Sequence, residues 1–238
     1  MAANLILPEG DIQGPYAVFY LLHGLSDDHT AWMRRTSIER YMEGLPIIVV
    51  MPDTGRGWYT DAVEGMAWES SIIKDLLPYI DKMFPTNATR SGRCIGGLSM
   101  GGYGALKLAL KHPDLFCSAV SHSGAPGRGH DPIPQDANDA WNIYMTRIFG
   151  PNPQGSDNDI FNLAEKLELS NRPALRIDCG VDDFLLLDNR RLHEHLIDIG
   201  YTHEYDEYPG DHNWAYWDIH VQEALKFHCK NLGIERAK

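Results

Sequence analysis

The stretch Gly97-Leu98-Ser99-Met100-Gly101-Gly102 contains the pattern Gly-x-Ser-x-Gly. A strand-like run, Arg93 to Leu98, leads into it, and a helix-like run, Tyr103 to Lys111, follows. A serine on so tight a strand-to-helix turn is held at the tip of the strand, and glycines flank it because side chains there would clash. The turn also places backbone N–H groups of a helix N-terminus where they can stabilise negative charge. The stretch therefore predicts acyl-transfer chemistry on Ser99.

Apolar, strand-like runs alternate with helix-like runs along the rest of the chain. The expected strands are Tyr16–Leu22, Ile47–Met51, Arg93–Leu98, Phe116–Ser121, Ala174–Cys179 and His203–Tyr208. The expected helices are Thr36–Met42, Ser70–Phe84 with a kink or early stop at Pro78, Tyr103–Lys111, Asn189–Ile199 and Trp217–Asn231. This alternation predicts an α/β fold, a mostly parallel sheet with helices on both faces. Ligands of such sheets bind at the carboxyl ends of the strands, where Ser99 is expected.

One segment breaks this rhythm. Residues 124–156 are rich in Gly, Pro, Asp and Asn, and the excursion extends as far as Ser170 in the wider interpretation. We expect a single domain over residues 1–238, in which residues 124–170 form a small cap or insertion over the active site. A mere surface decoration is the alternative.

Composition and charge exclude several classes of partner. The formal net charge of −12 disfavours nucleic acid and anionic membrane surfaces. No run approaches the roughly 18 apolar residues of a transmembrane helix. Residues Met1 to Asp11 lack the basic and apolar regions of a secretory signal, and Cys94, Cys117, Cys179 and Cys229 form no Cys-x-x-Cys pair. We therefore expect a cytoplasmic protein whose cysteines are small buried apolar residues in a reducing compartment.

A serine nucleophile needs a base within hydrogen-bond reach, and the base needs an orienting carboxylate. The chain order Ser, acid, His places both partners after Ser99, in loops that follow strands. His212 lies in the polar turn Tyr208–Trp214, between the last expected strand and the last expected helix, and is the predicted base. Ordinary surface or packing roles are expected for the histidines in helix-like runs and at a strand start, namely His193, His195, His203, His220 and His228.

The catalytic acid and the oxyanion hole are also expected in loops that follow strands. Asp182 and Asp183 both lie in the turn after an expected strand, and residue type alone does not choose between them. An oxyanion hole needs two N–H donors. Met100, the residue after the nucleophile, is one predicted donor, and Leu25, after the strand end His23-Gly24, is the other. We expect His23 to brace this loop rather than to act as a base.

Five motifs occur in order: YLLHGL (20–25), VVMPDTGRGWYTD (49–61), GLSMGG (97–102), CGVDDFL (179–185) and PGDHNW (209–214). In this combination the chain resembles the esterase-D-like esterase family of α/β-hydrolases, nearest to the small bacterial tributyrin-type carboxylesterases. The resemblance spans nearly the whole chain from Tyr16. It implies the α/β-hydrolase fold, a catalytic acid directly before Phe-Leu at Asp183, a base in the Pro-Gly-x-His turn at His212, and oxyanion donors at Leu25 and Met100.

The resemblance implies a serine carboxylesterase that hydrolyses short-chain acyl esters through an acyl-enzyme, with no cofactor. Feruloyl or acetyl-sugar ester hydrolysis and S-formylglutathione-type thioester hydrolysis are alternatives, and a non-catalytic binding module on the same fold is an alternative of another class. S-formylglutathione hydrolases usually carry Ser-Gly-Leu-Thr-Cys where this chain has residues 23–27, His-Gly-Leu-Ser-Asp. The segment before Tyr16 is shorter than in family members, so edge strands are expected to be absent or supplied by a neighbouring subunit of a homo-oligomer.

Aromatic residues are the candidates for contact with the substrate, a small-molecule ester. Trp58 and Tyr59 follow a strand end and are expected near the mouth of the site, and Trp141 and Tyr144 of the insertion are expected to line it. Ordinary packing is the alternative for each. The adjacent residues 27–29, Asp-Asp-His, carry metal-ligand side chains, but consecutive loop residues rarely converge on one ion, so no metal site is predicted.

Overall fold

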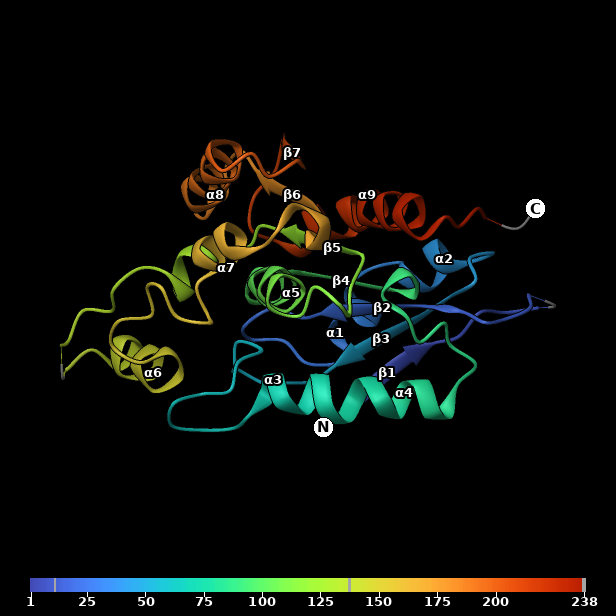
Figure 1. Cartoon of the computed structure of the whole chain (residues 1–238), viewed down its shortest axis with the longest axis horizontal. Helices are drawn as coiled ribbons and strands as arrows, with labels where there is room; N and C mark the ends of the chain where they lie inside the picture. Colours follow the sequence, from blue (N-terminus) through green and yellow to red (C-terminus); the bar gives the residue numbers. More distant parts are fainter. Residues whose placement is uncertain (11, 137, 237–238) are drawn as a thin grey trace.

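In the computed structural model of the chain, a seven-stranded sheet forms the centre of the described residues, which are 1–10, 12–136 and 138–236. Its order is β1-β3-β2-β4-β5-β6-β7 (Figure 1). The strands are β1 Ala3–Ile6, β2 Ala17–Leu22, β3 Ile47–Pro52, β4 Arg93–Leu98, β5 Ser118–His122, β6 Ala174–Gly180 and β7 His203–Tyr208. Four residues lie outside the described part of the chain. They are Asp11 of the N-terminal stretch, Ala137 of the expected insertion, and residues 237–238 at the end of the expected domain.

The predicted mostly parallel sheet is confirmed. All six expected strands form, with ends within two residues of the expected ones, and these six pair with one another in parallel. The expectation about edge strands is wrong at one edge, because β1 belongs to this chain and runs antiparallel to β3, with Ala3 opposite Pro52 and Ile6 opposite Val49.

Helices cover both faces of the sheet, as predicted (Figure 1). The side chains of β2 explain why, since alternate residues of a strand point to opposite faces. Val18, Tyr20 and Leu22 contact one core, which includes η1 (Ser71–Leu76), α4 (Leu77–Met83), α5 (Met100–Lys111), α7 (Ile160–Lys166) and α8 (Leu186–Asp198). The intervening residues 17, 19 and 21 contact the other core, which includes α1 (Ala31–Arg35), α2 (Ile38–Met42) and α9 (Trp214–Leu232).

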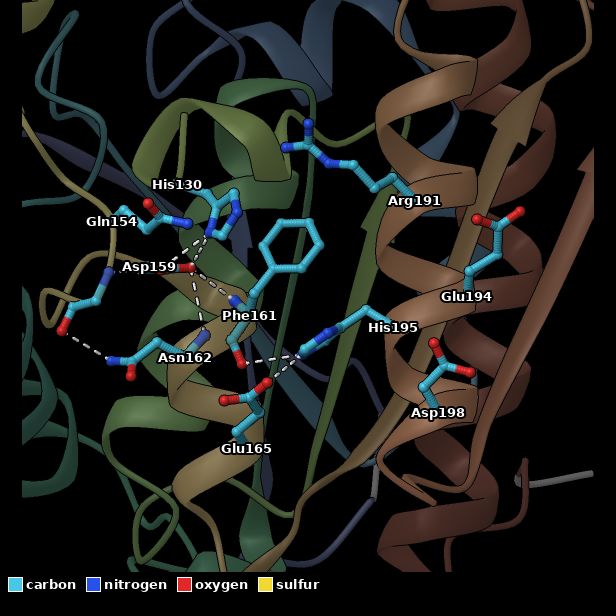
Figure 2. A pocket seen from close by; sticks show the side chains of 11 residues that line it. His130, Gln154, Asp159, Phe161, Asn162, Glu165, Arg191, Glu194, His195 and Asp198 are labelled. Atoms are coloured by element: carbon cyan, nitrogen blue, oxygen red, sulfur yellow. Dashed lines mark hydrogen bonds and ion pairs between the residues drawn. The ribbon is translucent and has the colours of Figure 1, made fainter. Parts of the chain in front are cut away.

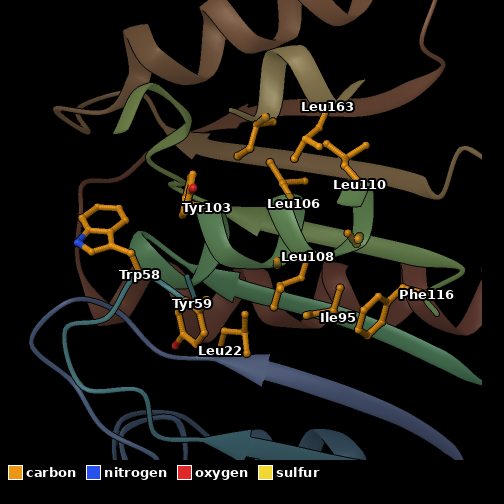
Figure 3. Close-up of a cluster of buried hydrophobic side chains, with 14 of the residues drawn as sticks. Leu22, Trp58, Tyr59, Ile95, Tyr103, Leu106, Leu108, Leu110, Phe116 and Leu163 are labelled. Carbon is orange, nitrogen blue, oxygen red and sulfur yellow. The ribbon is translucent and has the colours of Figure 1, made fainter. Parts of the chain in front are cut away.

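Helix α5 lies in the larger core, where Leu106, Leu108 and Leu110 are buried among side chains of the sheet and of α7 (Figure 3). Full burial of such a side chain stabilises the fold by about 1.5–3 kcal/mol. This packing fixes the helix that begins directly after Ser99.

Lys107, also on α5, is fully buried without being apolar. Its ammonium donates to the Tyr59 carbonyl at 2.7 Å, to the Thr60 hydroxyl at 3.1 Å and to the Glu69 carboxylate at 2.6 Å. Burial lowers the pKa of Lys107 to about 8, against the opposing effect of Glu69. The lysine therefore ties the segment after β3 to the helix after Ser99.

The helix expected over residues 70–84 forms as α3 (Trp68–Ser70), the π-helical η1 and α4. The early stop that was one expectation at Pro78 is wrong, because α4 continues to Met83. Pro78 lies in the first turn of α4, where the wider π-helical turns precede it and its missing N–H is tolerated.

The segment after β5 contains η3 (Pro126–Gly129), α6 (Ala140–Phe149), α7 and η4 (Leu169–Asn171). A further short helix, η2 (Arg90–Gly92), lies directly before β4. Figure 1 shows α6 set apart, beyond the end of the sheet at which the parallel strands finish. Phe149 packs edge-on against the rings of Trp58 and Tyr103. The insertion is thus anchored to the core, and its role as a cap over substrate stays a prediction.

All four cysteines are free thiols, of which Cys94 and Cys179 are buried as expected, whereas Cys117 and Cys229 are only half-buried. Within the described part of the chain, no helix has the length and apolar character that crossing a bilayer requires.

Candidate active site

Ser99 joins β4 to α5 in a backbone conformation that is rare for a residue with a side chain, with φ 52° and ψ −114°. Such a conformation costs about 1–3 kcal/mol, so the surrounding packing must impose it. A Cβ on Gly97 would lie 2.7 Å from the backbone of Gly101, and a Cβ on Gly101 would lie 2.5 Å from the Leu22 carbonyl oxygen. The Ser99 N–H donates to the His122 carbonyl at 2.9 Å. The tight turn expected around Ser99 is therefore present, at the carboxyl end of β4.

The loop after β7 brings His212 to this serine. The His212 Nε2 atom lies 3.0 Å from Ser99 Oγ, and its Nδ1 atom lies 2.8 Å and 3.0 Å from the two carboxylate oxygens of Asp183. Because Nδ1 faces a carboxylate, it carries the proton of the neutral ring and leaves Nε2 free to accept one. The three side chains form one continuous chain of hydrogen bonds that can deprotonate the serine hydroxyl.

Backbone hydrogen bonds join the two loops that carry the acid and the base. The Val181 N–H donates to the Tyr208 carbonyl, and the Asp182 N–H donates to the Gly210 carbonyl, both at 2.9 Å. The loops approach closely at Gly180, where a Cβ would lie 2.4 Å from the Gly210 oxygen. A larger residue at Gly180 would therefore force the acid and the base apart.

The structure brings Asp183, and not the exposed Asp182, to the imidazole. The Asp183 side chain is 0% exposed, and one of its oxygens accepts the Leu185 N–H at 2.8 Å. Burial alone would raise the pKa of Asp183, but hydrogen bonds from His212, the Leu185 N–H and Ser123 outweigh it and hold the pKa below its usual value. Asp183 is therefore ionised at neutral pH and can stabilise a protonated imidazole.

Three residues around His212 did not stand out in the sequence. The Trp217 ring meets the imidazole edge-on at 4.9 Å between centroids, and its indole N–H donates to Ser123 Oγ at 3.2 Å. The Phe184 ring lies 4.5 Å from the imidazole but is 73% exposed. The position of Phe184 directly after the acid was the one signal that could have identified it.

The loop after β2 lies against Ser99, since a Cβ on Gly24 would be 3.9 Å from Ser99 Cβ. Within the described residues, neither the Leu25 N–H nor the Met100 N–H has a hydrogen-bond acceptor. Met100 is the first residue of α5, so its N–H has no partner inside the helix. Both amides are thus available to a ligand beside Ser99, and their role as oxyanion donors stays a prediction.

Trp58 and Tyr59 are not at the mouth of a site, which corrects that expectation. Their side chains are 3% and 0% exposed. Trp58 packs edge-on against Tyr103, and the Tyr59 hydroxyl donates to the His23 carbonyl at 2.9 Å. Both side chains are therefore part of the core beneath the site.

Trp141 and Tyr144 are half-buried on α6. The Tyr144 hydroxyl accepts the Trp58 indole N–H at 2.9 Å and donates to the Arg56 carbonyl. The Trp141 ring packs on Tyr144 and faces the Arg128 guanidinium at 5.6 Å. These contacts account for both residues as packing between α6 and its surroundings, and their contact with substrate stays a prediction.

A separate cavity of about 540 Å³ lies between α7 and α8, and none of the residues Ser99, Asp183 and His212 lines it (Figure 2). His130 Nδ1 lies 2.9 Å and 3.0 Å from the carboxylate oxygens of Asp159, which also caps α7. These polar groups satisfy one another, so they give no sign of a ligand.

Comparison with known proteins gives matches along nearly the whole chain. The model of the family described as "Putative esterase" matches residues 1–228. An acetyl esterase of Caldicellulosiruptor saccharolyticus is 31% identical over 224 residues, which cover 89% of this chain and 82% of that protein. Esterase Rv1288 of Mycobacterium tuberculosis (strain ATCC 25618 / H37Rv) is 34% identical over 238 residues, which cover 88% of this chain and 52% of that protein.

Solved structures match equally broadly. FphF, a fluorophosphonate-binding serine hydrolase of Staphylococcus aureus, has a TM-score of 0.83 and 31% identity, and the match covers 95% of this chain and 91% of that one. The S-formylglutathione hydrolase FrmB from Staphylococcus aureus has a TM-score of 0.80 and 32% identity, with the same coverage of 95% and 91%. The similarity therefore extends over the fold and is not confined to one motif.

Proposed function

Because the chain belongs to the "Putative esterase" family and is an ester hydrolase with the α/β-hydrolase fold, we propose that it is a serine carboxylesterase acting on short-chain acyl esters. The observation that carries the proposal is the chain of hydrogen bonds from Ser99 through His212 to Asp183. A serine hydroxyl alone is a weak nucleophile at neutral pH, and this arrangement supplies the base that activates it.

In the first half-reaction, His212 Nε2 accepts the proton of Ser99 Oγ as that oxygen attacks the ester carbonyl carbon. The negative charge passes to the carbonyl oxygen, which accepts hydrogen bonds from the N–H groups of Leu25 and Met100. Removal of one such donor from a serine protease costs about 2.7–4 kcal/mol. The bond to the alcohol then breaks, the protonated His212 gives its proton to the leaving oxygen, and the acyl group stays on Ser99.

In the second half-reaction, His212 accepts a proton from water, whose oxygen attacks the acyl-enzyme. The same two amides stabilise the second oxyanion. Ser99 leaves with the proton held by His212, and the carboxylic acid is released. The proposed reaction steps use no metal or organic cofactor.

The acetyl esterase among the relatives supports a small acyl group. A thioester substrate is the second candidate, because FrmB is an S-formylglutathione hydrolase with 32% identity to this chain. The loop at residues 23–27 argues against it, since it departs from the sequence usual in those enzymes. A small-molecule ester remains the proposed partner.

A substrate series with purified protein tests the proposal. We expect kcat/KM to be highest for p-nitrophenyl acetate to butyrate and to fall at least about tenfold by the octanoate. Methyl ferulate and S-formylglutathione, assayed in parallel, should be poorer substrates. Preference for S-formylglutathione would identify a thioesterase instead, and no turnover of any compound, together with no labelling by a serine-directed fluorophosphonate, would indicate a binding module.

A further inference from the structure

His23 follows directly after the last residue of β2. Its side chain is buried, with 1% exposed, yet its ring makes two hydrogen bonds. Its Nδ1 atom lies 2.7 Å from the Gly24 carbonyl oxygen, and the Thr54 N–H donates to its Nε2 atom at 3.2 Å. A carbonyl oxygen only accepts a hydrogen bond and an amide N–H only donates one. The two contacts therefore require a neutral ring with its proton on Nδ1.

The Gly24 carbonyl belongs to the same peptide unit as the Leu25 N–H. Its oxygen also accepts the Asp27 N–H at 3.2 Å, so two donors fix its direction. In a planar trans peptide, the C=O and N–H bonds point in opposite directions. A carbonyl held toward the His23 ring therefore directs the Leu25 N–H away from that ring, in a loop that lies against Ser99.

We propose that His23 is a positioning residue for the oxyanion hole: its Nδ1–H holds the Gly24 carbonyl and thereby aims the Leu25 N–H at the substrate oxygen. The inference rests on the proposed esterase function. His23 does not touch the substrate and acts only through the peptide between Gly24 and Leu25.

The surroundings of the His23 ring keep it neutral. Burial lowers the pKa of His23, against opposing effects from the Gly24 carbonyl and from nearby acids. The closest of these acids is Asp53, with one oxygen 3.6 Å from Nε2, and Asp27 and Asp28 act from farther away. The Tyr59 ring lies 5.8 Å from the imidazole. The neutral ring at neutral pH thus leaves Nε2 as the acceptor for Thr54.

Two substitutions separate the contacts of His23. In His23→Asn, the side-chain amide nitrogen stands where Nδ1 stood and can still donate to Gly24, while the contact with Thr54 is lost. In His23→Gln, the longer side chain can still accept the Thr54 N–H, while the donation to Gly24 is lost. Both variants leave the nucleophile, the base and the acid in place.

The readouts are kcat and KM for p-nitrophenyl acetate and the inhibition constant of a trifluoromethyl ketone, which forms a tetrahedral adduct with an oxyanion. We expect His23→Gln to lower kcat by about 10- to 100-fold, with KM within about threefold, since loss of a whole donor costs about 10²–10³-fold. Its ketone inhibition constant should rise in parallel with the loss in kcat. His23→Asn should recover most of both. Equal losses in the two variants, or unchanged kcat in His23→Gln, would overturn the proposal.

Wild-type protein provides a test that does not depend on the folding of variants. Nitrogen NMR of the His23 imidazole should show the proton on Nδ1, and a proton on Nε2 would contradict the inference. Failure of the inference is distinct from failure of the proposed function, because in the second case wild-type protein would neither hydrolyse the esters nor form the ketone adduct.

Discussion

Asp183 contacts the His212 imidazole with both carboxylate oxygens, at 2.8 Å and 3.0 Å, from a side chain that is 0% exposed. Its neighbour Asp182 is exposed and donates its backbone N–H to the Gly210 carbonyl. Two adjacent aspartates thus stand in opposite environments. They offer a matched pair of substitutions with the same chemistry.

We expect Asp183→Asn to lower kcat for p-nitrophenyl acetate by about 10³- to 10⁴-fold, because an amide favours the wrong tautomer of His212 and cannot stabilise its protonated form. Asp182→Asn should stay within about twofold of wild type, since its contact with the described residues comes from the backbone N–H. Initial rates under saturating substrate measure both. Comparable losses in the two variants would show that the carboxylate of Asp183 has no special role.

The exposed Phe184 ring beside His212 should contact the alcohol part of aromatic esters. Phe184→Ala should raise KM for p-nitrophenyl and naphthyl acetates by about three- to tenfold, in line with about 0.5–1.5 kcal/mol for an aromatic pair. KM for ethyl acetate should change less, because it has no ring to stack. Ile197→Ala, at a residue of α8 that is 57% exposed, is the control and should leave both constants near wild type. An equal effect of Phe184→Ala on all esters would contradict stacking.

Lys107 should matter for stability far more than a surface lysine does. Lys107→Met removes a fully buried ammonium and, among the described residues, leaves Lys111 and His112 as the side chains within ion-pair distance of the Glu69 carboxylate. Breaking a buried pair costs about 3–5 kcal/mol, and the remaining partners favour the lower end of that range. Lys226→Met, which breaks an exposed contact to Glu223, should cost less than about 1 kcal/mol. Urea unfolding measures both values, and similar losses would refute the buried network.

We expect the protein to lose stability in mild acid because of His228. Its ring is fully buried, and burial lowers its pKa to about 3 from 6.5. Between these values the unfolded chain binds the proton and the folded chain does not, so this contribution to stability is complete above pH 6.5 and declines as the pH falls. From pH 6.5 to pH 5, this titration lowers the free energy of unfolding by about 2 kcal/mol.

His228→Asn removes this titration and keeps a nitrogen near the Ser118 hydroxyl, which lies 2.8 Å from Nδ1. We expect the free energy of unfolding to fall less between pH 7 and pH 5 in this variant than in wild type, by about 2 kcal/mol. Urea unfolding at the two pH values makes the comparison. Parallel pH dependences would show that His228 does not titrate on unfolding.

Sequence patterns predicted the edge strand β7 and the strands inside the sheet, whose residues are buried on both faces and form long apolar runs. It missed β1, whose four residues Ala3–Ile6 are only half-buried and lie at an edge. Pro78 misled the prediction of a stop, because it lies in the first turn of α4, where the missing N–H of a proline is tolerated. The Gly-x-Ser-x-Gly turn and the polar turn at His212 were visible because special backbone geometry and loop position both leave marks in a sequence.

Trp58 and Tyr59 show what a sequence does not reveal. Both residues adopt positive φ values, 52° and 54°, and both side chains are buried. Tyr59 fits there because Gly104 carries no side chain, since a Cβ on Gly104 would lie 2.4 Å from the tyrosine ring. Residue type alone likewise left the choice between Asp182 and Asp183 open. The family resemblance pointed to Asp183, and the physical reason is a contact between two loops that are distant in the sequence.

The account depends most on Ser99 as the activated nucleophile. Intact-mass and peptide mass spectrometry after treatment with a fluorophosphonate probe tests this directly. We predict one adduct per chain, located on Ser99, absent from Ser99→Ala and formed at least about 10³-fold more slowly in His212→Ala. Labelling at another residue, or undiminished labelling of Ser99→Ala, would contradict it.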